Sequence, residues 1–282
     1  MSTSRIVEFA GLDDLTLVGD EWNHATAIAG RPTILMLHGG GQNRFSWKNT
    51  GQILADLGYR VVAVDTRGHG DSDRAPEADY ALESLTADVV AVIDQIGTPV
   101  VVIGASMGGL TGIMAADAAG PDKVTKLILV DVVPRFEKSG STRIRDFMFS
   151  HVHGFESLEE AAAAVAEYLP HRAKPQSPEG LKKNLRLRDG RWHWHWDPAF
   201  LTKPRDDPFE RVDKMEAAAM RLQIPILLIR GRLSDVVSTA GVNDFLQKVP
   251  HAEFVELSGA GHTAAGDDND AFSESVVQFV NR

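Results

Sequence analysis

A serine stands where the sequence predicts a sharp turn from a strand into a helix, in the segment Gly104-Ala105-Ser106-Met107-Gly108-Gly109. The apolar run Val100–Ile103 precedes this segment, and the helical stretch LTGIMAADAAG follows it. The backbone of a serine at such a turn is strained, so the residues two before and two after it must be small, as Gly104 and Gly108 are. The hydroxyl of Ser106 would then lie exposed above the edge of the sheet, which is the place of a nucleophile.

Two other interpretations of this glycine-rich turn were weighed. A phosphate-binding loop of a dinucleotide fold needs the pattern G-x-G-x-x-G near the first strand, whereas Ser106 occupies the place of the middle glycine and lies far from the N-terminus. Alternatively, the small residues only pack a helix against a strand. The catalytic interpretation is favoured because partners for Ser106 occur downstream.

A serine needs a base to become nucleophilic, and His262 is the candidate. It follows the predicted strand Glu253–Leu257 in the loop Ser258-Gly259-Ala260-Gly261-His262 and precedes the last predicted helix. Because Ser106 also follows the carboxyl end of a strand, both side chains are expected at the same edge of the sheet. A histidine in such a loop is otherwise an exposed turn residue, so its assignment depends on its partners.

The acid that holds this base should also follow a strand. Asp235, in the segment Gly231-Arg232-Leu233-Ser234-Asp235-Val236-Val237, is preferred because the acid then comes from the strand before the histidine, in the chain order Ser, Asp, His. Asp131, directly after Lys126–Val130, is its rival and is otherwise expected to brace the start of an insertion. Three further acids close to His262 are better explained as charges at the N-terminus of the final helix: Asp267, Asp268 and Asp270.

A loop of three glycines follows the predicted strand Thr33–Leu37 in the run His38-Gly39-Gly40-Gly41. Glycines let backbone amides approach a ligand closely, so the N–H groups of Gly40 and Met107 are expected to form an oxyanion hole. Gly41 is a candidate third donor and substrate contact. His38 is expected to fix this loop rather than to carry protons. Taken alone, the loop would be read as a flexible turn.

The polar stretch Asp65-Thr66-Arg67-Gly68-His69-Gly70-Asp71-Ser72 contains several catalytic residue types. Polar, glycine-rich loops after strands often only brace a turn, and we interpret this one as structural. An ion pair between Asp65 and Arg67 is expected within it.

Tryptophan and histidine alternate in Trp192-His193-Trp194-His195-Trp196. In an extended segment this period of two places the three Trp side chains on one face and the two His side chains on the other. The Trp strip either walls a hydrophobic substrate pocket or fixes a lid to the core. A metal site at His193 and His195 lacks a clear third ligand, so no metal is expected.

Short apolar runs alternate with amphipathic stretches along the chain, which is typical of helices packed on a mostly parallel sheet. The predicted strands are Arg5–Phe9, Leu15–Val18, Thr33–Leu37, Arg60–Val64, Val100–Ile103, Lys126–Val130, Ile226–Ile229 and Glu253–Leu257. The predicted helices are Trp47–Leu57, Leu82–Ile96, Met107–Ala119, Ala240–Lys248 and Ala271–Val280. These elements bring the candidate residues to one edge of an eight-stranded sheet.

This rhythm fails between residues 134 and 205, where Ala-rich and basic helical stretches appear. The segment holds 13 Lys and Arg against 9 Asp and Glu, and nine of the 20 aromatic residues. We therefore predict a core of residues 1–133 and 206–282 and a lid or cap of residues 134–205. The cap carries about +4 and the core about −14, so the cap could attract an anionic substrate. Alternatively, its charges coat solvated helices and its aromatic residues fill a small core of their own.

Length and composition limit the remaining function classes. With 282 residues and 43% hydrophobic residues, the chain is long enough for one large globular domain with an insertion. A formal net charge of −10 argues against binding to nucleic acid or an anionic membrane. The lack of cysteine excludes disulfides, thiolate catalysis and cysteine-held metals. The N-terminal residues contain no apolar signal or span, so a cytoplasmic location is expected.

Taken together, the motifs HGGG, DTRGHGDSD, GASMGG, GRLSDVV and GAGH resemble the α/β-hydrolase fold superfamily along nearly the full chain. The resemblance implies a triad of Ser106, His262 and Asp235, an oxyanion hole from Gly40 and Met107, and a helical cap after the sixth strand of the core. A serine at the turn speaks against the epoxide hydrolases and haloalkane dehalogenases of this fold.

The resemblance implies a cofactor-free serine hydrolase that acts on a carboxylic ester, thioester or lactone of a small molecule. Among the branches of this superfamily, the capped esterases, the cofactor-free haloperoxidases and the carbon–carbon bond hydrolases are the most similar. A perhydrolase, a diketone hydrolase and a small-molecule receptor that reuses the fold stay open as alternatives. The sequence also leaves open whether the protein forms a homo-oligomer.

Overall fold

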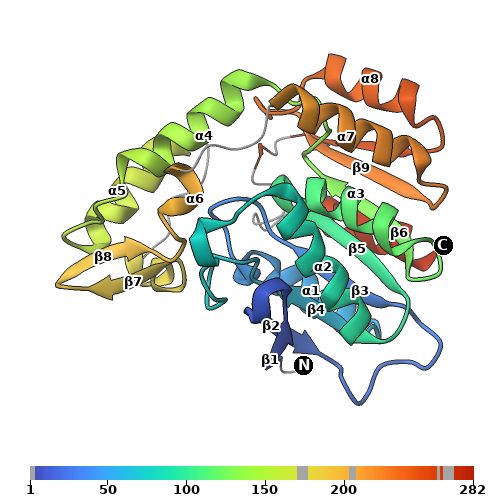
Figure 1. Cartoon of the computed structure of the whole chain (residues 1–282), viewed down its shortest axis with the longest axis horizontal. Helices are drawn as coiled ribbons and strands as arrows, with labels where there is room; N and C mark the ends of the chain where they lie inside the picture. Colours follow the sequence, from blue (N-terminus) through green and yellow to red (C-terminus); the bar gives the residue numbers. More distant parts are fainter. Residues whose placement is uncertain (1–3, 170–176, 203–207, 259–260, 263–269) are drawn as a thin grey trace.

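The fold is described from a computed structural model that covers residues 4–169, 177–202, 208–258, 261–262 and 270–282. Its centre is an eight-stranded sheet in the order β1-β2-β4-β3-β5-β6-β9-β10 (Figure 1). From β4 to β10 the neighbouring strands are parallel, whereas β2 is antiparallel to both β1 and β4. The mostly parallel eight-stranded sheet is thus confirmed. Its strands are β1 (Arg5–Ala10), β2 (Thr16–Trp22), β3 (Thr33–Leu37), β4 (Val61–Val64), β5 (Val100–Ala105), β6 (Val124–Val130), β9 (Ile226–Gly231) and β10 (Glu253–Leu257).

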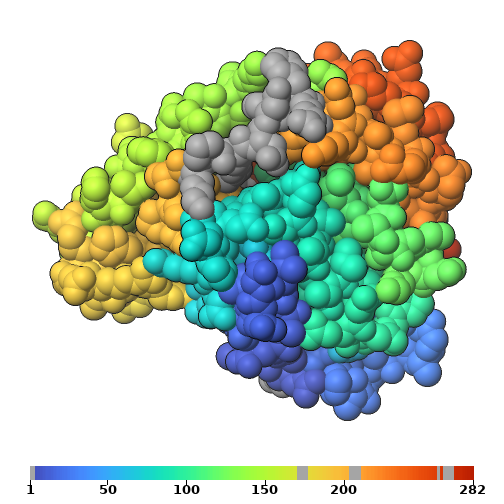
Figure 2. Space-filling view, in the orientation of Figure 1, coloured from blue at the N-terminus to red at the C-terminus, as the bar shows by residue number. Residues whose placement is uncertain are grey.

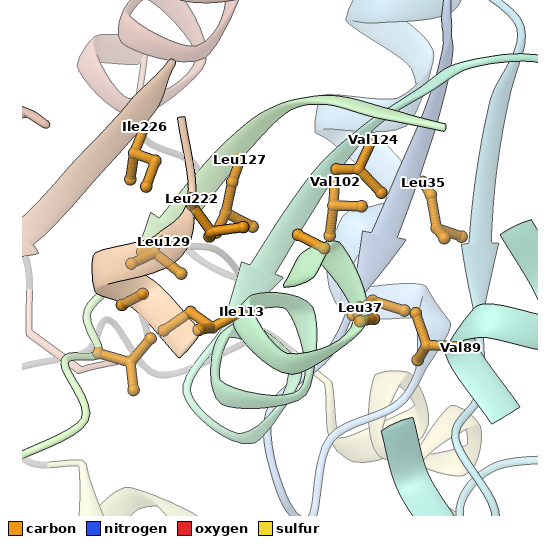
Figure 3. Close-up of a cluster of buried hydrophobic side chains, with 14 of the residues drawn as sticks. Leu35, Leu37, Val89, Val102, Ile113, Val124, Leu127, Leu129, Leu222 and Ile226 are labelled. Atoms are coloured by element: carbon orange, nitrogen blue, oxygen red, sulfur yellow. The ribbon is translucent and has the colours of Figure 1, made fainter. Parts of the chain in front are cut away.

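Helices cover both faces of this sheet, which is why its central strands are apolar without alternation. In β3, Leu35 and Leu37 pack on one face and Ile34 and Met36 on the other. The first face, shown in Figure 3, is covered by α2 (Leu82–Ile96), α3 (Met107–Ala119), α7 (Pro208–Arg221) and α8 (Thr239–Lys248). The second face is covered by α1 (Lys48–Asp56) and α9 (Asp270–Asn281).

Two helical features differ from the sequence prediction. Helix α7 has no counterpart among the predicted helices, although its residues Ala218 and Ala219 pack into the core. The helix before β4 is split into the 3-10 helix η2 (Arg44–Trp47) and α1. Two other short 3-10 helices, η1 (Leu12–Asp14) and η3 (Pro76–Ala78), lie in loops.

The part of the chain from α4 to α6, which lies between β6 and β9, forms a layer beside the core, although these two strands are neighbours in the sheet (Figures 1 and 2). Its elements are α4 (Lys138–Ser150), α5 (Leu158–Tyr168), η4 (Pro178–Lys183), β7 (Leu185–Arg188), β8 (Arg191–Trp194) and α6 (Ala199–Thr202). The antiparallel hairpin β7–β8 pairs the stretch of alternating Trp and His, which was expected to be extended, with residues for which no strand was predicted. We call residues 134–205 the cap segment below, with the predicted bounds.

Aromatic and aliphatic side chains of the cap segment form their own hydrophobic cluster with Leu15 and Tyr80 of the core. This cluster therefore fixes the cap segment against the sheet domain. Among the described residues, no helix is both long enough and apolar enough to span a membrane.

Candidate active site

Ser106 lies at the turn between β5 and α3, in the strained conformation that the sequence predicts. Its φ is 48° and its ψ is −117°, a region that residues other than glycine rarely adopt. A Cβ atom on Gly104 would collide with the backbone of Gly108, and one on Gly108 would collide with the backbone carbonyl of Leu37. The expected need for glycine two residues before and two residues after Ser106 is therefore confirmed.

Asp131 is the acid that binds His262. Nδ1 of His262 and Oδ2 of Asp131 are 2.7 Å apart, and the Asp131 side chain is fully buried. The other contacts of this carboxylate come from the loop after β9: the N–H of Gly231 donates to Oδ1 at 3.0 Å, and the Ser234 hydroxyl donates to Oδ2. Asp131 has a φ of 49°, so its backbone too is held in a conformation that non-glycine residues rarely adopt.

The prediction that Asp235 is the acid partner of His262 is wrong, because Asp131 takes that place. Asp235 instead forms a bidentate ion pair with Arg143 of α4, with N–O distances of 2.7 and 3.0 Å. Partial burial acts to raise the pKa of Asp235, but Arg143 holds that pKa below its ordinary value, and His262 acts weakly in the same direction. Asp131 and Asp235 follow the neighbouring strands β6 and β9, and Asp235 is bound by Arg143 of the cap segment.

Ser106 and Asp131 lie side by side at the ends of neighbouring strands. The N–H of Ser106 donates to the carbonyl of Val130 at 3.1 Å, and Asp131 is the next residue. The carboxylate of Asp131 in turn holds His262 near this edge of the sheet. In the described part of the chain, no hydrogen bond joins the Ser106 hydroxyl to His262. The approach of the His262 ring to this hydroxyl during catalysis is therefore part of the function that we propose below.

The glycine loop after β3 lies against Ser106. A Cβ atom on Gly39 would be 3.3 Å from Cβ of Ser106, and one on Gly40 would be 3.9 Å from Sδ of Met107. The N–H of Gly39 donates to Oε1 of Gln42 at 3.0 Å. The N–H of Gly40 has no acceptor among the described residues. That free N–H fits the expected oxyanion donor.

Gly41 differs from the expectation of a third donor, because its N–H already donates to Nε2 of His69 at 3.1 Å. Its φ of +75° also makes this a position that favours glycine. Gly41 therefore belongs to the hydrogen-bonding frame of the loop.

His38 fixes the loop from below, as the sequence suggested. Its Nδ1–H donates to the carbonyl of Gly39 at 2.8 Å, and its Nε2 accepts the N–H of Thr66 at 3.0 Å. These partners assign the neutral tautomer that carries its proton on Nδ1. Complete burial lowers the pKa of His38 from 6.5 to about 4, so the ring stays neutral near pH 7.

The expected ion pair between Asp65 and Arg67 is wrong. Asp65 binds Arg44 of η2, and the N–H of Arg44 donates to Oδ1 of Asp65 at 2.6 Å. Arg67 forms a buried bidentate pair with Asp88 of α2 at 2.6 and 2.8 Å. The loop turns between residues 65 and 67, so these side chains point to opposite sides of it.

The three tryptophans form part of the cluster inside the cap segment. Trp194 and Trp196 are buried and stacked at 4.8 Å, and the ring of Trp196 would lie 3.6 Å from a Cβ on Gly41. Trp192 is partly buried, and its backbone pairs with Phe155. The strip thus fastens the cap segment to the glycine loop, while substrate contact by Trp192, Trp194 and Trp196 stays a prediction.

In the part of the chain that the structure describes, no cluster of three or more His, Cys, Asp or Glu side chains suited to a metal ion occurs. Nδ1 of His195 accepts the N–H of Gly70 at 2.7 Å instead. Among the acids near His262, Asp270 begins α9 as predicted, and Asp267 and Asp268 lie outside the described residues.

Several residues around this site were missed by sequence reasoning. Ser234 braces Asp131, His69 binds Gly41, and Arg143 binds Asp235. For Ser234, the available signal in the sequence was its position next to Asp235 in one motif. No local signal joins Arg143 to a residue 92 positions later in the chain.

Comparison with known proteins finds similar sequences along most of the chain. A sequence model of the alpha/beta hydrolase fold matches residues 32–268. The chain is 28% identical to the esterase Rv0045c of Mycobacterium tuberculosis over 253 residues, which cover 87% of this chain and 81% of that protein. It is 26% identical to the mouse sn-1-specific diacylglycerol lipase ABHD11, with 95% of this chain and 87% of the relative covered.

Solved structures show the same similarity over the whole chain. The crystal structure of an alpha/beta hydrolase from Novosphingobium aromaticivorans has a TM-score of 0.82 and 25% identity, and the match covers 100% of this chain and 99% of that one. The Mycobacterium tuberculosis esterase Rv0045c has a TM-score of 0.80 and 26% identity, with 100% and 93% of the two chains covered.

Proposed function

Because the chain belongs to the α/β-hydrolase fold family, we propose that it is a serine esterase for small molecules with Ser106, His262 and Asp131 as its triad. The observation that carries this proposal is the contact between Nδ1 of His262 and the buried carboxylate of Asp131. A carboxylate there holds the proton of His262 on Nδ1, so Nε2 is left as the base. The esterases and lipase among the similar proteins support this reaction class.

In the proposed reaction, Nε2 of His262 takes the proton of the Ser106 hydroxyl while Oγ attacks the ester carbonyl carbon. The carbonyl oxygen becomes an oxyanion, which accepts hydrogen bonds from the N–H groups of Gly40 and Met107. His262 then gives its proton to the leaving alcohol, and an acyl-enzyme on Ser106 remains. Water, activated by His262, cleaves this acyl-enzyme to release the carboxylic acid and restore Ser106.

The charges around the site favour a neutral acyl group over the anionic substrate that the charge of the cap segment first suggested. Arg143 of α4 reaches the loop after β9, where it pairs with Asp235. Other cations of the cap segment are paired as well: Lys182 with Glu179, Arg186 with Asp71, and Arg191 with Glu156. Four of the 13 basic residues of this segment are thus paired, two of them with acids of the core, Asp235 and Asp71.

Apolar side chains support the same choice of substrate. Phe200 lies 3.6 Å from the Cβ position of Gly40, and Met148 lies 3.0 Å from that of Gly41. Both residues, together with the partly buried Met107, belong to the hydrophobic cluster of the cap segment. A short or medium hydrophobic acyl chain would find matching surface next to the oxyanion donors.

The test is hydrolysis of p-nitrophenyl butyrate by the wild type, Ser106→Ala and His262→Ala. We expect turnover in the wild type and a loss of at least about 10³-fold in each variant, because the triad acts as a unit. Ser275→Ala, in α9 on the far face of the sheet, is the matched control and should keep full activity. Undiminished turnover in Ser106→Ala contradicts the mechanism.

Labelling and a substrate panel separate the alternatives. A fluorophosphonate probe should label the wild type and leave Ser106→Ala unlabelled, whereas a receptor that reuses the fold would stay unlabelled in both forms. A panel of thioester, lactone and diketone substrates compares the other bond types with the ester. Faster cleavage of a diketone than of any ester would replace the esterase by a carbon–carbon bond hydrolase.

A further inference from the structure

We propose that His195 of the cap segment is a positioning residue that acts through His69 to hold the oxyanion loop of residues 39–41. This inference rests on the proposed esterase function, because it assumes that Gly40 binds an oxyanion. The evidence for it is independent of the triad. It consists of hydrogen bonds that connect the cap segment to the loop of residues 65–72, and that loop to Gly41.

The loop is held on both sides of Gly40. The Gly40 N–H lies in the same peptide as the carbonyl of Gly39, which accepts from Nδ1–H of His38. The next peptide, between Gly40 and Gly41, is held because the N–H of Gly41 donates to Nε2 of His69 at 3.1 Å. Without the bond to His69, this second peptide could rotate about the flexible backbone of Gly40, and Gly40 with its N–H could shift relative to Met107.

His69 is in turn held by its surroundings. Its Nδ1–H donates to the carbonyl of Arg67 at 3.1 Å, which leaves Nε2 without a proton and able to accept from Gly41. Its ring contacts Phe200 edge to face at 4.9 Å, and the ring of His195 at 6.0 Å. Two of these three contacts reach residues of the cap segment.

His195 completes the connection from the cap segment. It is buried, and its Nδ1 accepts the N–H of Gly70, the residue next to His69, at 2.7 Å. Burial lowers the pKa of His195 well below its ordinary value, and the neighbouring His69 acts in the same direction. His195 therefore lies beside Gly70 and the ring of His69.

The remaining nitrogen of His195 leaves Gly70 as its hydrogen-bonding partner. Since Nδ1 accepts a hydrogen bond, the neutral ring carries its proton on Nε2, and this buried atom has no hydrogen-bond partner among the described residues. Buried donors without a partner are rare. Among the described residues, the hydrogen bond of the His195 side chain is therefore the one that holds Gly70.

The test compares His195→Asn with His195→Gln. The Asn side chain offers its carbonyl oxygen near the place of Nδ1 and can still accept from Gly70, whereas the Gln side chain offers it near the place of Nε2. Tyr80→Phe is the matched control, because it removes another bond of the cap segment, from the Tyr80 hydroxyl to Asp197 at 2.6 Å, that does not lead to Gly41. The measurements are kcat and KM with p-nitrophenyl butyrate, and the Kd of a trifluoromethyl ketone that forms an oxyanion on Ser106.

We expect His195→Gln to lower kcat by about 10- to 100-fold, because a displaced oxyanion donor acts on the transition state. KM should stay within about twofold, and the trifluoromethyl ketone should bind more weakly by the same factor as kcat. His195→Asn and Tyr80→Phe should keep kcat within about threefold of the wild type. If His195→Gln does not fold, His195→Leu replaces it with the same expectation.

The inference is overturned if His195→Gln keeps the wild-type kcat, if His195→Asn loses as much kcat as His195→Gln, or if Tyr80→Phe shows the same loss. A weaker KM with unchanged kcat also overturns it, since that pattern indicates substrate access rather than loop geometry. Failure of the esterase proposal looks different: the wild type itself would neither hydrolyse the ester nor react with a fluorophosphonate.

Discussion

Replacing Asp131 with Asn should nearly abolish activity while leaving the fold intact. In the wild type, Oδ2 of Asp131 accepts the proton on Nδ1 of His262, and Oδ1 accepts the N–H of Gly231. In the variant, the Asn carbonyl keeps the bond to Gly231, so its amide nitrogen faces His262. That nitrogen donates to Nδ1 of His262 and forces the ring proton onto Nε2.

A histidine with its proton on Nε2 cannot accept the proton of Ser106. The same change in a serine protease lowers kcat about 10⁴-fold, which corresponds to about 5 kcal/mol of transition-state stabilisation. We expect a loss of about 10³- to 10⁴-fold in kcat for Asp131→Asn. The free energy of unfolding should change by no more than about 2 kcal/mol, because the variant keeps hydrogen bonds to Gly231 and His262 and loses only the one that Asp131 accepts from the Ser234 hydroxyl.

Asp235→Asn is the matched control for this prediction. It also exchanges a carboxylate for an amide in a loop at the same edge of the sheet, but it breaks only the half-exposed ion pair with Arg143. Exposed ion pairs contribute about 0–1 kcal/mol, so stability should barely change and turnover of a neutral ester should stay within about threefold. Both variants are compared with the wild type by kcat for p-nitrophenyl butyrate and by chemical unfolding.

The opposite pattern refutes the assignment. If Asp235→Asn lost about 10³-fold and Asp131→Asn kept wild-type turnover, the acid role would return to Asp235. Equal, severe losses in both variants would mean that the ion pair with Arg143 is itself needed for catalysis.

Three further predictions concern packing, pH and charge. Gly104→Ala should cost more than about 3 kcal/mol of stability or prevent folding, because its Cβ collides with backbone, whereas Gly180→Ala, where a Cβ meets nothing within 4 Å, should leave the melting temperature unchanged. Burial lowers the pKa of His38 from 6.5 to about 4, so the folded protein disfavours protonation of this ring. The free energy of unfolding of the wild type, relative to that of His38→Asn, should therefore be highest above pH 6.5 and should fall by about 3 kcal/mol towards pH 4. Urea titrations at these pH values measure this difference, and a difference that does not change with pH would contradict the prediction. Asp235→Asn removes the carboxylate that pairs with Arg143, so it should raise the ratio of kcat/KM for the anionic mono-p-nitrophenyl glutarate to that for the neutral butyrate about fivefold at low salt. Adding Arg143→Gln should remove this gain. An unchanged ratio in Asp235→Asn would show that Arg143 does not meet the substrate.

Much of the sheet and of the turn at Ser106 could be predicted because local rules decide them. Apolar runs without alternation identify strands that are buried on both faces, and the spacing of Gly104 and Gly108 around Ser106 reflects contacts within one turn. The extended segment of alternating Trp and His likewise became β8 and its continuation. Such features depend on residues that are close in the sequence.

Choices between equivalent partners could not be predicted in this way. Asp131 and Asp235 follow neighbouring strands and are similarly placed by topology, and they are separated by long-range contacts, of His262 with Asp131 and of Arg143 with Asp235. Arg67 and Asp65 are close in sequence, yet each binds a group about 21 residues away in another element. Long-range side-chain contacts of this kind leave no periodic signal in the sequence.

The hydrogen bonds of Asp131 also make the site sensitive to how completely the chain has folded. Its partners Gly231, Ser234 and His262 lie 100, 103 and 131 residues further along the chain, on the far side of the cap segment. The carboxylate can acquire them only after β9 has paired with β6 and the whole intervening segment has been closed into a loop. Recovery of esterase activity during refolding would therefore follow the last long-range strand pairing, and partly folded chains would be inactive even with Ser106 already at its turn.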